Sequence, residues 1–235
     1  MSDSYQMADQ SLRLTMSETV FHPTTTTQKL ADCVKIPKGG TVLDLGCGSG
    51  PIAIFAAMKG ASHVWAVDIM QSACELTTRN ARENGLLDKI TAVCGSLFEP
   101  VKGMRFDLII DDVSGIAHRV ARLSKWFPPS IPTGGEDGTD LIIDVLEQSP
   151  EHINPGGSIV FPILSLSRAS KIIDRARELF SDATECIASY RFPLRGELLN
   201  AIDELTEMRD EGLIHFEKRG SRYFWTLDIW QATVR

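Results

Sequence analysis

Several sequence features that define other protein classes are missing from this chain. It has no run of 18 apolar residues, so we expect no transmembrane helix. The opening residues MSDSYQMADQ are polar and lack the apolar segment of a secretory signal. The five cysteines are odd in number and contain no C-x-x-C pair, which argues against a disulfide framework and a zinc site. We therefore expect a cytoplasmic protein with reduced thiols and no metal.

An excess of basic residues is also missing. Lys and Arg number 24 against 31 Asp and Glu, which gives a net charge of -7. Nucleic acid and anionic membranes are usually bound by a basic face, so we expect neither as a partner. The length of 235 residues and the 43% hydrophobic content suit one folded domain with a full core. Composition leaves a homodimer open.

What the sequence does contain is an alternation of short apolar strands and helices. Strands are predicted at Thr41–Leu45, His63–Asp68, Ile90–Val93, Phe106–Asp111, Ser158–Leu164, Glu185–Phe192 and Tyr223–Ala232. Helices are predicted at Thr27–Val34, Pro51–Lys59, Gln71–Asn84, Asp140–Gln148 and Arg168–Phe180. The pattern predicts an α/β fold with a mostly parallel, seven-stranded sheet and helices on both faces. Such sheets bind ligands at the carboxyl ends of their strands.

Two segments stand outside this alternation. Residues 1–30 are mainly polar and without strong periodicity, so we interpret them as an arm or lid on a domain spanning residues 31–235. Residues 195–222 contain the helical stretch Leu198–Asp210 between the last two predicted strands. This stretch is predicted to be an insertion that either covers the substrate or makes a dimer contact.

A glycine-rich loop follows the first predicted strand directly. Gly46, Gly48 and Gly50 permit positive φ and let a ligand approach the backbone, and the next helix points its free N–H groups at the same place. A dinucleotide loop of the form G-x-G-x-x-G would have glycine where Pro51 stands. The lysine of a phosphate-binding loop is absent.

The next two strands end in further candidate ligand-binding residues. Asp68 ends the second strand, where a carboxylate can accept hydrogen bonds from two ribose hydroxyls; the alternative is a helix N-cap. Ile69 would then line the adenine of a bound nucleoside. Ser96 and Leu97 follow the third strand, and their backbone groups are predicted to contact the same base.

The series Asp44-Leu45-Gly46-Cys47-Gly48-Ser49-Gly50 resembles motif I of the class I S-adenosylmethionine (AdoMet)-dependent methyltransferases. The resemblance implies a Rossmann-like fold with AdoMet as cofactor. It also implies that Asp44 lies near the amino group of the methionine moiety, beside Gly46, Cys47, Gly48 and Gly50. Gly134–Asp140 is similar to the G-G-x-D-G-x-D segment of release-factor glutamine methyltransferases, and Phe21–Thr25 to the lead-in of ribosomal-protein L11 methyltransferases.

The resemblance breaks at the expected reaction centre. The glutamine and adenine amino methyltransferases carry N-P-P-Y after the fourth strand, and this chain has Asp112-Val113-Ser114-Gly115. Val113 and Gly115 cannot form the clamp for a planar amide. Asp111 and Asp112 are predicted to be catalytic, because two carboxylates can bind an amine or accept a proton from the nucleophile. The alternative is a capping Asp111 and a solvated Asp112. Asp112 is also predicted to lie against the cofactor.

Four residues are predicted to face the acceptor: His22, Thr25, Ser114 and Glu136. His22 and Thr25 lie in the arm, where they would cover the methionine end of AdoMet or remain exposed. Ser114 would bind the substrate or a turn amide, and Glu136 would line the pocket. The apolar loop Trp126–Pro129 is either a pocket wall or ordinary packing.

These features predict an AdoMet-dependent methyltransferase that acts on a nitrogen or oxygen of a small molecule. Two alternatives stay open: methylation of a protein side chain, at an amide or amine, and an AdoMet-binding protein without catalysis. The sequence identifies no particular acceptor.

Overall fold

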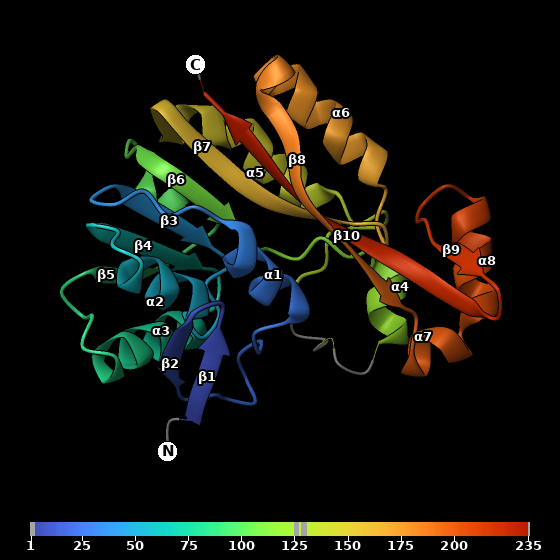
Figure 1. Cartoon of the computed structure of the whole chain (residues 1–235), viewed down its shortest axis with the longest axis horizontal. Helices are drawn as coiled ribbons and strands as arrows, with labels where there is room; N and C mark the ends of the chain where they lie inside the picture. Colours follow the sequence, from blue (N-terminus) through green and yellow to red (C-terminus); the bar gives the residue numbers. More distant parts are fainter. Residues whose placement is uncertain (1–2, 125–126, 128–130, 235) are drawn as a thin grey trace. The chain divides into compact units, whose positions relative to one another are not determined.

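A computed structural model of the chain describes residues 3–124, 127 and 131–234 (Figure 1). Of the apolar loop predicted at Trp126–Pro129, only Phe127 is among the described residues, and its side chain is buried. The contacts within the chain define two units, each of which is described by itself. The first comprises residues 1–112, 148–161 and 231–235, and the second comprises residues 113–147 and 162–230.

The first unit is built on a parallel sheet. Its strands are β3 (Thr41–Leu45), β4 (His63–Asp68), β5 (Ile90–Cys94), β6 (Phe106–Asp111) and the first part of β7 (Ile153–Leu164). β3 lies between β4 and β6, and Leu43 pairs with Trp65 on one side and Ile109 on the other. Val42, Leu43 and Leu45 are fully buried. A strand whose successive residues are buried in this way requires cover on both of its faces.

Three α-helices belong to this unit: α1 (Thr25–Cys33), which precedes β3, α2 (Pro51–Met58), which follows β3, and α3 (Gln71–Glu83), which follows β4. Pro51 occupies the first turn of α2, where its missing N–H breaks no helical hydrogen bond. The Ala- and Ile-rich α2 is almost wholly buried and packs against β3 and β4, while α3 packs against β4 and β5. Two short 3-10 helices, η1 (Glu99–Val101) and η2 (Ser149–His152), complete the helical structure of the unit.

The N-terminal segment forms a hairpin that the sequence analysis did not predict. β1 (Asp3–Met7) and β2 (Gln10–Leu14) pair antiparallel in a separate two-stranded sheet, and β2 packs against α2 and α3. Met7, Leu12 and Leu14 are buried, whereas most other residues of the hairpin are exposed. So few apolar residues give no clear strand period, and their burial depends on the distant helices.

β7 begins five residues earlier than predicted. Asn154, Pro155, Gly156 and Gly157 belong to the strand rather than to a preceding turn. The Gly156 N–H donates to the Val234 carbonyl at 2.9 Å, and the Val234 N–H donates to the Gly157 carbonyl at 3.0 Å. The prediction was wrong because these hydrogen bonds come from the end of the chain, close to β10 (Arg222–Thr233).

The second unit contains the remaining elements. They are α4 (His118–Leu123), α5 (Asp140–Gln148, whose last residue belongs to the first unit), α6 (Ala169–Phe180), η3 (Ser181–Ala183), β8 (Thr184–Pro193), α7 (Gly196–Asn200), α8 (Ile202–Asp210), β9 (Glu217–Arg219) and most of β10. β10 pairs antiparallel with β9, and the strand order of the large sheet is β5-β4-β3-β6-β7-β10-β8. The sheet thus has one strand more than the seven predicted. The predicted helix Leu198–Asp210 is two helices, separated at Ala201. Within the described ranges, no helix is both long and apolar enough to cross a membrane.

Candidate functional site

The loop between β3 and α2 is held at both of its ends. The N–H groups of Gly46 and Cys47 both donate to the Val67 carbonyl on β4, at 2.9 and 3.1 Å. The Gly50 N–H donates to the Cys47 carbonyl at 2.7 Å, which closes the turn. The loop therefore lies at the carboxyl ends of β3 and β4 with its backbone already ordered.

Glycine is required at Gly50 for two separate reasons. Its φ of +84° lies in the left-handed region, where a side chain is strained. A Cβ atom at this position would also lie 2.9 Å from the Thr77 side chain on α3. Thr77 in turn donates to the Gly48 carbonyl at 3.0 Å. The loop and α3 thus pack too closely for any residue with a side chain.

Asp68 joins the glycine loop to the start of α3. One carboxylate oxygen accepts from the Gly48 N–H and the other from the Met70 N–H, both at 2.9 Å. The alternative interpretation of Asp68 as a helix N-cap holds in part: its side chain accepts a hydrogen bond from the Met70 N–H at the start of α3, but Met70 is the residue at the N-cap position. Each carboxylate oxygen can accept a second hydrogen bond, so the same geometry leaves capacity for a pair of ligand hydroxyls.

Asp44 is a buried acid with an unusual environment. Its side chain is fully buried on β3, and neither carboxylate oxygen has a hydrogen-bond partner of ordinary geometry among the described residues. Burial raises the pKa of Asp44 well above its usual value, and the nearby charge of Asp112 adds to the effect. The Ala53 backbone N–H acts in the opposite direction. A buried acid without a partner is costly unless a cation or donor reaches it.

Asp112 lies directly after β6 and is fixed by the arm. Its N–H donates to the Leu45 carbonyl at 2.9 Å, and its carboxylate accepts from the Thr27 hydroxyl on α1 at 2.7 Å. Burial raises the pKa of Asp112 to about 7, and the Thr27 hydrogen bond lowers it only in part. The sequence analysis placed Thr27 at the start of a predicted helix but did not identify it as the partner of Asp112. No local pattern connects residues 85 positions apart.

The other two predicted arm residues, His22 and Thr25, belong to the same unit. His22 is exposed and its Nε2 lies 3.1 Å from the Ser17 carbonyl oxygen. Thr25 is exposed on the first turn of α1, which begins at the N-cap Thr24. A Cβ atom on Gly48 would lie 3.3 Å from the Phe21 carbonyl oxygen, so the arm passes over the glycine loop.

The predicted adenine contacts lie at the ends of β4 and β5. Ile69 is 58% exposed, which is unusual for a large apolar residue beside a buried strand. Leu97 has a φ of +46°, and the Ser96 carbonyl accepts from the Glu99 N–H at 2.9 Å. The exposed Ile69 side chain and this ordered turn offer an apolar surface and fixed backbone groups.

The remaining predicted acceptor residues belong to the second unit. The Ser114 hydroxyl is buried and makes no hydrogen bond within the described part of the chain. Glu136 is exposed in the Gly134–Asp140 loop. Asp137 beside it is buried, and its carboxylate accepts from the Thr139 hydroxyl at 2.6 Å and pairs with Lys171 at 3.4 Å. Asp137 therefore holds its own loop rather than facing a ligand.

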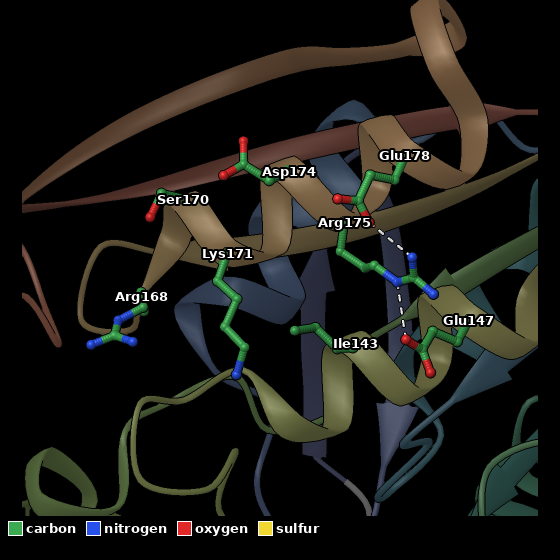
Figure 2. Close-up of a pocket in the computed structure, with 8 residues that line it drawn as sticks. All are labelled: Ile143, Glu147, Arg168, Ser170, Lys171, Asp174, Arg175 and Glu178. Atoms are coloured by element: carbon green, nitrogen blue, oxygen red, sulfur yellow. Dashed lines mark hydrogen bonds and ion pairs between the residues drawn. The ribbon is translucent and has the colours of Figure 1, made fainter.

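A charged groove lies between α5 and α6 of the second unit (Figure 2). Arg175 pairs with Glu147 at 2.9 Å and with Glu178 at 2.8 Å, as the dashed lines of Figure 2 mark. Acidic and basic side chains alternate along the groove, and none of the predicted site residues lines it. The arrangement is that of a solvated helix face. Among the described residues, no group of three or more His, Cys, Asp and Glu side chains could hold a metal ion.

Several known proteins are similar to this chain in sequence. The sequence profile of the ribosomal protein L11 methyltransferase (PrmA) family matches residues 19–137. A ribosomal protein uL3 glutamine methyltransferase from Bradyrhizobium diazoefficiens is 37% identical over 57% of this chain and 43% of that protein. A release factor glutamine methyltransferase from Geobacter sulfurreducens is 33% identical over 59% of this chain and 50% of that protein. The chain spans about half the length of the curated relatives it matches.

Solved structures show the same fold. The ribosomal protein L11 methylase of Lactobacillus delbrueckii subsp. bulgaricus superposes with a TM-score of 0.55 at 22% identity, over 88% of this chain and 80% of that one. The Thermus thermophilus 16S rRNA N2 G1207 methyltransferase in complex with AdoMet and guanosine gives a TM-score of 0.62 at 14% identity, over 100% of this chain and 50% of that one. The predicted Rossmann-like methyltransferase fold is therefore confirmed.

Proposed function

The chain belongs to the ribosomal protein L11 methyltransferase (PrmA) family, and from this premise we propose that it methylates a protein side chain with AdoMet as the donor. The matching profile covers the glycine loop, Asp68 and Asp112, which are the residues on which the proposal depends. Bound AdoMet supplies an activated methyl group on a sulfonium. The steps below concern the residues of this chain.

The residues present fit AdoMet on the evidence of Asp44. AdoMet carries a cationic ammonium and a cationic sulfonium, and the carboxyl ends of β3, β4 and β6 bring together Asp44, Asp68, Asp111 and Asp112 as mutual sources of negative potential. A cationic ligand at this place offsets both the burial of Asp44 and the repulsion among the acids. Asp68 would hold the ribose, and Gly46, Cys47, Gly48 and Gly50 would line the methionine end.

The relatives support a protein as the methyl acceptor, and Asp112 supports an amine as the acceptor group. The named relatives act on ribosomal protein L11, ribosomal protein uL3 and release factors, which supports a protein acceptor over the small molecule that the sequence analysis favoured. Within that class we assign an amine, because Asp112 replaces the residue that begins the amide-binding motif N-P-P-Y. A carboxylate that titrates near pH 7 can take the proton from a lysine ammonium or an N-terminal amine.

Asp112 therefore has two tasks in the proposed reaction. It attracts the ammonium group while ionised, and it accepts one proton so that the nitrogen lone pair becomes free to attack. The Thr27 hydrogen bond fixes the direction of the carboxylate. Holding nucleophile and methyl donor in line supplies much of the remaining acceleration.

Methyl-labelled AdoMet and purified ribosomal proteins and release factors provide the test. We expect label on a lysine ε-nitrogen or an N-terminal nitrogen, located by mass spectrometry, and its loss when acceptor amines are first blocked by reductive methylation. Label on glutamine, retained after blocking, would contradict the amine assignment. Transfer to small molecules alone would contradict the protein acceptor.

A further inference from the structure

Three of the five cysteines meet beside the proposed ribose site. Cys47 lies in the glycine loop, Cys74 in the first turns of α3, and Cys94 at the end of β5. Cys47 and Cys74 are 3% and 4% exposed, whereas Cys94 is exposed. Their positions in the sequence, with no C-x-x-C spacing, give no sign of this meeting.

Two backbone carbonyls bring Cys74 and Cys94 together. The Cys74 sulfur lies 3.6 Å from the Asp68 carbonyl oxygen, and the Cys94 sulfur lies 3.4 Å from the carbonyl oxygen of the next residue, Ile69. β4 and β5 also pair in register at Asp68 and Cys94. The Gly95 N–H, directly after Cys94, donates to the same Asp68 carbonyl at 3.0 Å. The Cys74 and Cys94 sulfurs therefore both lie against the Asp68–Ile69 stretch of backbone.

The three thiols are not equivalent as nucleophiles. Hydrogen bonding with Cys47, and to a smaller extent with Cys94, lowers the pKa of Cys74 despite its burial. The same interaction raises the pKa of Cys47 well above its usual value, and burial followed by the interaction with Cys74 raises that of Cys94. The thiolate is the attacking species in disulfide chemistry, so Cys74 is the resolving nucleophile and exposed Cys94 is the thiol that meets an oxidant.

We propose that Cys74 and Cys94 are a modification site, where a peroxide forms a disulfide that weakens AdoMet binding. The Cys94 thiol first reacts with hydrogen peroxide to give a sulfenic acid and water. The Cys74 sulfur then attacks the Cys94 sulfur, and a second water leaves with the sulfenic oxygen. The two thiols together lose two electrons, which reduce one peroxide to two waters.

The effect on binding follows from where the bond would form. A disulfide holds its two sulfurs at about 2.05 Å, which is closer than two separate thiols approach each other. Closing that gap draws the end of β5 toward α3. Ser96 and Leu97 follow Cys94 directly, and Asp68 and Ile69 carry the carbonyls that face the two sulfurs. The regulatory part of the inference rests on the proposed use of these residues for AdoMet.

Peroxide treatment of the full chain, with peptide mapping and calorimetry, tests both parts. We expect a Cys74–Cys94 linkage in the oxidised protein and a fall in AdoMet affinity of about tenfold or more, reversed by dithiothreitol. Cys94→Ser should show neither change and should bind AdoMet like the reduced wild type. Cys186→Ser is the matched control, because Cys186 is also exposed but lies on β8 of the second unit. This control should behave as the wild type does.

Three results would overturn the inference. They are a linkage between Cys47 and Cys74, oxidation of Cys94 without any linkage, and a Cys74–Cys94 linkage that leaves AdoMet affinity unchanged. A reduced wild type that binds no AdoMet would instead contradict the proposed function. In that case the peptide map alone would still decide the thiol chemistry.

Discussion

Among single residues, Asp112 has both a pKa close to neutral pH and a carboxylate held in place by a hydrogen bond from Thr27. A carboxyl group whose pKa is about 7 is ionised in roughly half of the molecules at neutral pH, so it can both accept and release a proton there. Asp44 differs because it is fully buried and its carboxylate makes no hydrogen bond of ordinary geometry with a described residue. We therefore assign proton transfer to Asp112 and cation binding to Asp44.

Replacing Asp112 by Asn should separate binding from turnover. Asn keeps the size of the side chain and can still accept from Thr27, but it cannot take a proton. We expect AdoMet affinity within about twofold of the wild type and a loss of kcat of about 10²- to 10⁴-fold. Calorimetry and single-turnover kinetics measure the two quantities. Normal turnover in this variant would exclude Asp112 as the base.

The raised pKa of Asp112 predicts the direction in which both kcat and stability of the wild type change with pH. The kcat should rise by about tenfold per pH unit below pH 7 and level off above it, because the ionised form of Asp112 is the base. Stability should move in the opposite direction. The folded-state pKa lies above that of the unfolded chain, so the contribution of Asp112 to the free energy of unfolding is fully present near pH 4 and is lost as the pH rises through 7. Asp112→Asn should therefore remove the inflection near pH 7 from both profiles.

Asp68 offers a second test at this scale. Asp68→Ala removes the acceptors of the Gly48 and Met70 N–H groups as well as the proposed ribose contacts. Each charge-assisted hydrogen bond contributes about 1.5–3 kcal/mol, so AdoMet affinity should fall by at least tenfold. Asp68→Asn is the control, because it keeps the size of the side chain and one of the two acceptor oxygens without the charge, and it should bind with an intermediate affinity. Equal affinity of Asp68→Ala and wild type would remove Asp68 from the site.

Among the structural elements, α3 organises the first unit through two amide side chains. Asn80 is fully buried; it accepts from the Thr15 N–H at 2.9 Å and donates to the Thr15 and Ser49 carbonyls at 3.0 and 2.8 Å. Asn84, one turn further along, bonds the Arg13 N–H and carbonyl in the same way. The helix thereby fixes the segment after β2 and the glycine loop together.

The two asparagines form a matched pair of substitutions. Asn80→Ala leaves buried backbone groups without partners, each at a cost of about 1–3 kcal/mol, whereas the Arg13 groups bonded by Asn84 can turn to water. We expect Asn80→Ala to lower both the free energy of unfolding and AdoMet affinity, and Asn84→Ala to have a clearly smaller effect on each. Urea denaturation and calorimetry make the comparison. Equal effects would show that Asn80 does not couple the hairpin to the loop.

The glycine loop provides another matched pair. Gly50 and Gly39 have similar φ angles of +84° and +73°, but a Cβ atom on Gly39 would meet no atom within 4 Å. Gly39→Ala should therefore lose only the backbone term of about 1–2 kcal/mol. Gly50→Ala adds a contact with Thr77 at 2.9 Å and should lower both stability and AdoMet affinity further. The prediction fails if the two variants are equally stable and bind AdoMet equally well.

At the scale of the whole molecule, acidic residues outnumber basic ones, and several acids gather at the carboxyl ends of the strands around Asp44. The net charge is -7, and three acids at the strand ends, Asp68, Asp111 and Asp112, add to the negative potential around Asp44. AdoMet differs from S-adenosylhomocysteine by the methyl group and its positive charge. We expect the protein to bind AdoMet more tightly, and the difference to shrink as salt is raised.

Ligand binding should also appear in the stability of the entire chain. A ligand at 100 times its Kd stabilises the folded state by about 2.7 kcal/mol. For a chain of this size that corresponds to a rise in Tm of roughly 5–10 °C. Thermal unfolding with AdoMet and, in parallel, NAD measures it. A shift with NAD alone would mean that the loop holds a dinucleotide.

The sequence by itself determined the elements with strong local signals. The bounds of β3, β4, β6 and α5 were predicted to the residue. For the strands, the end of an apolar run at a glycine loop or an acidic residue marks the boundary within the local sequence. The same signals placed Asp44 and Asp68 at the carboxyl ends of β3 and β4 and Asp112 directly after β6, where parallel connections bring side chains to one edge.

Only the tertiary structure decided which distant groups meet. The β1–β2 hairpin is held by asparagines on α3, the start of β7 is set by the end of the chain, and Asp112 is bonded by Thr27 from the arm. The thiols of Cys47, Cys74 and Cys94 meet in the same way, across three elements. Periodicity reports which face of an element is buried, but it carries no information about which partner covers that face. The sequence therefore predicted the loop that we propose binds AdoMet, while only the folded chain showed how Asp112, the proposed proton acceptor, is held and that the three thiols lie near one another.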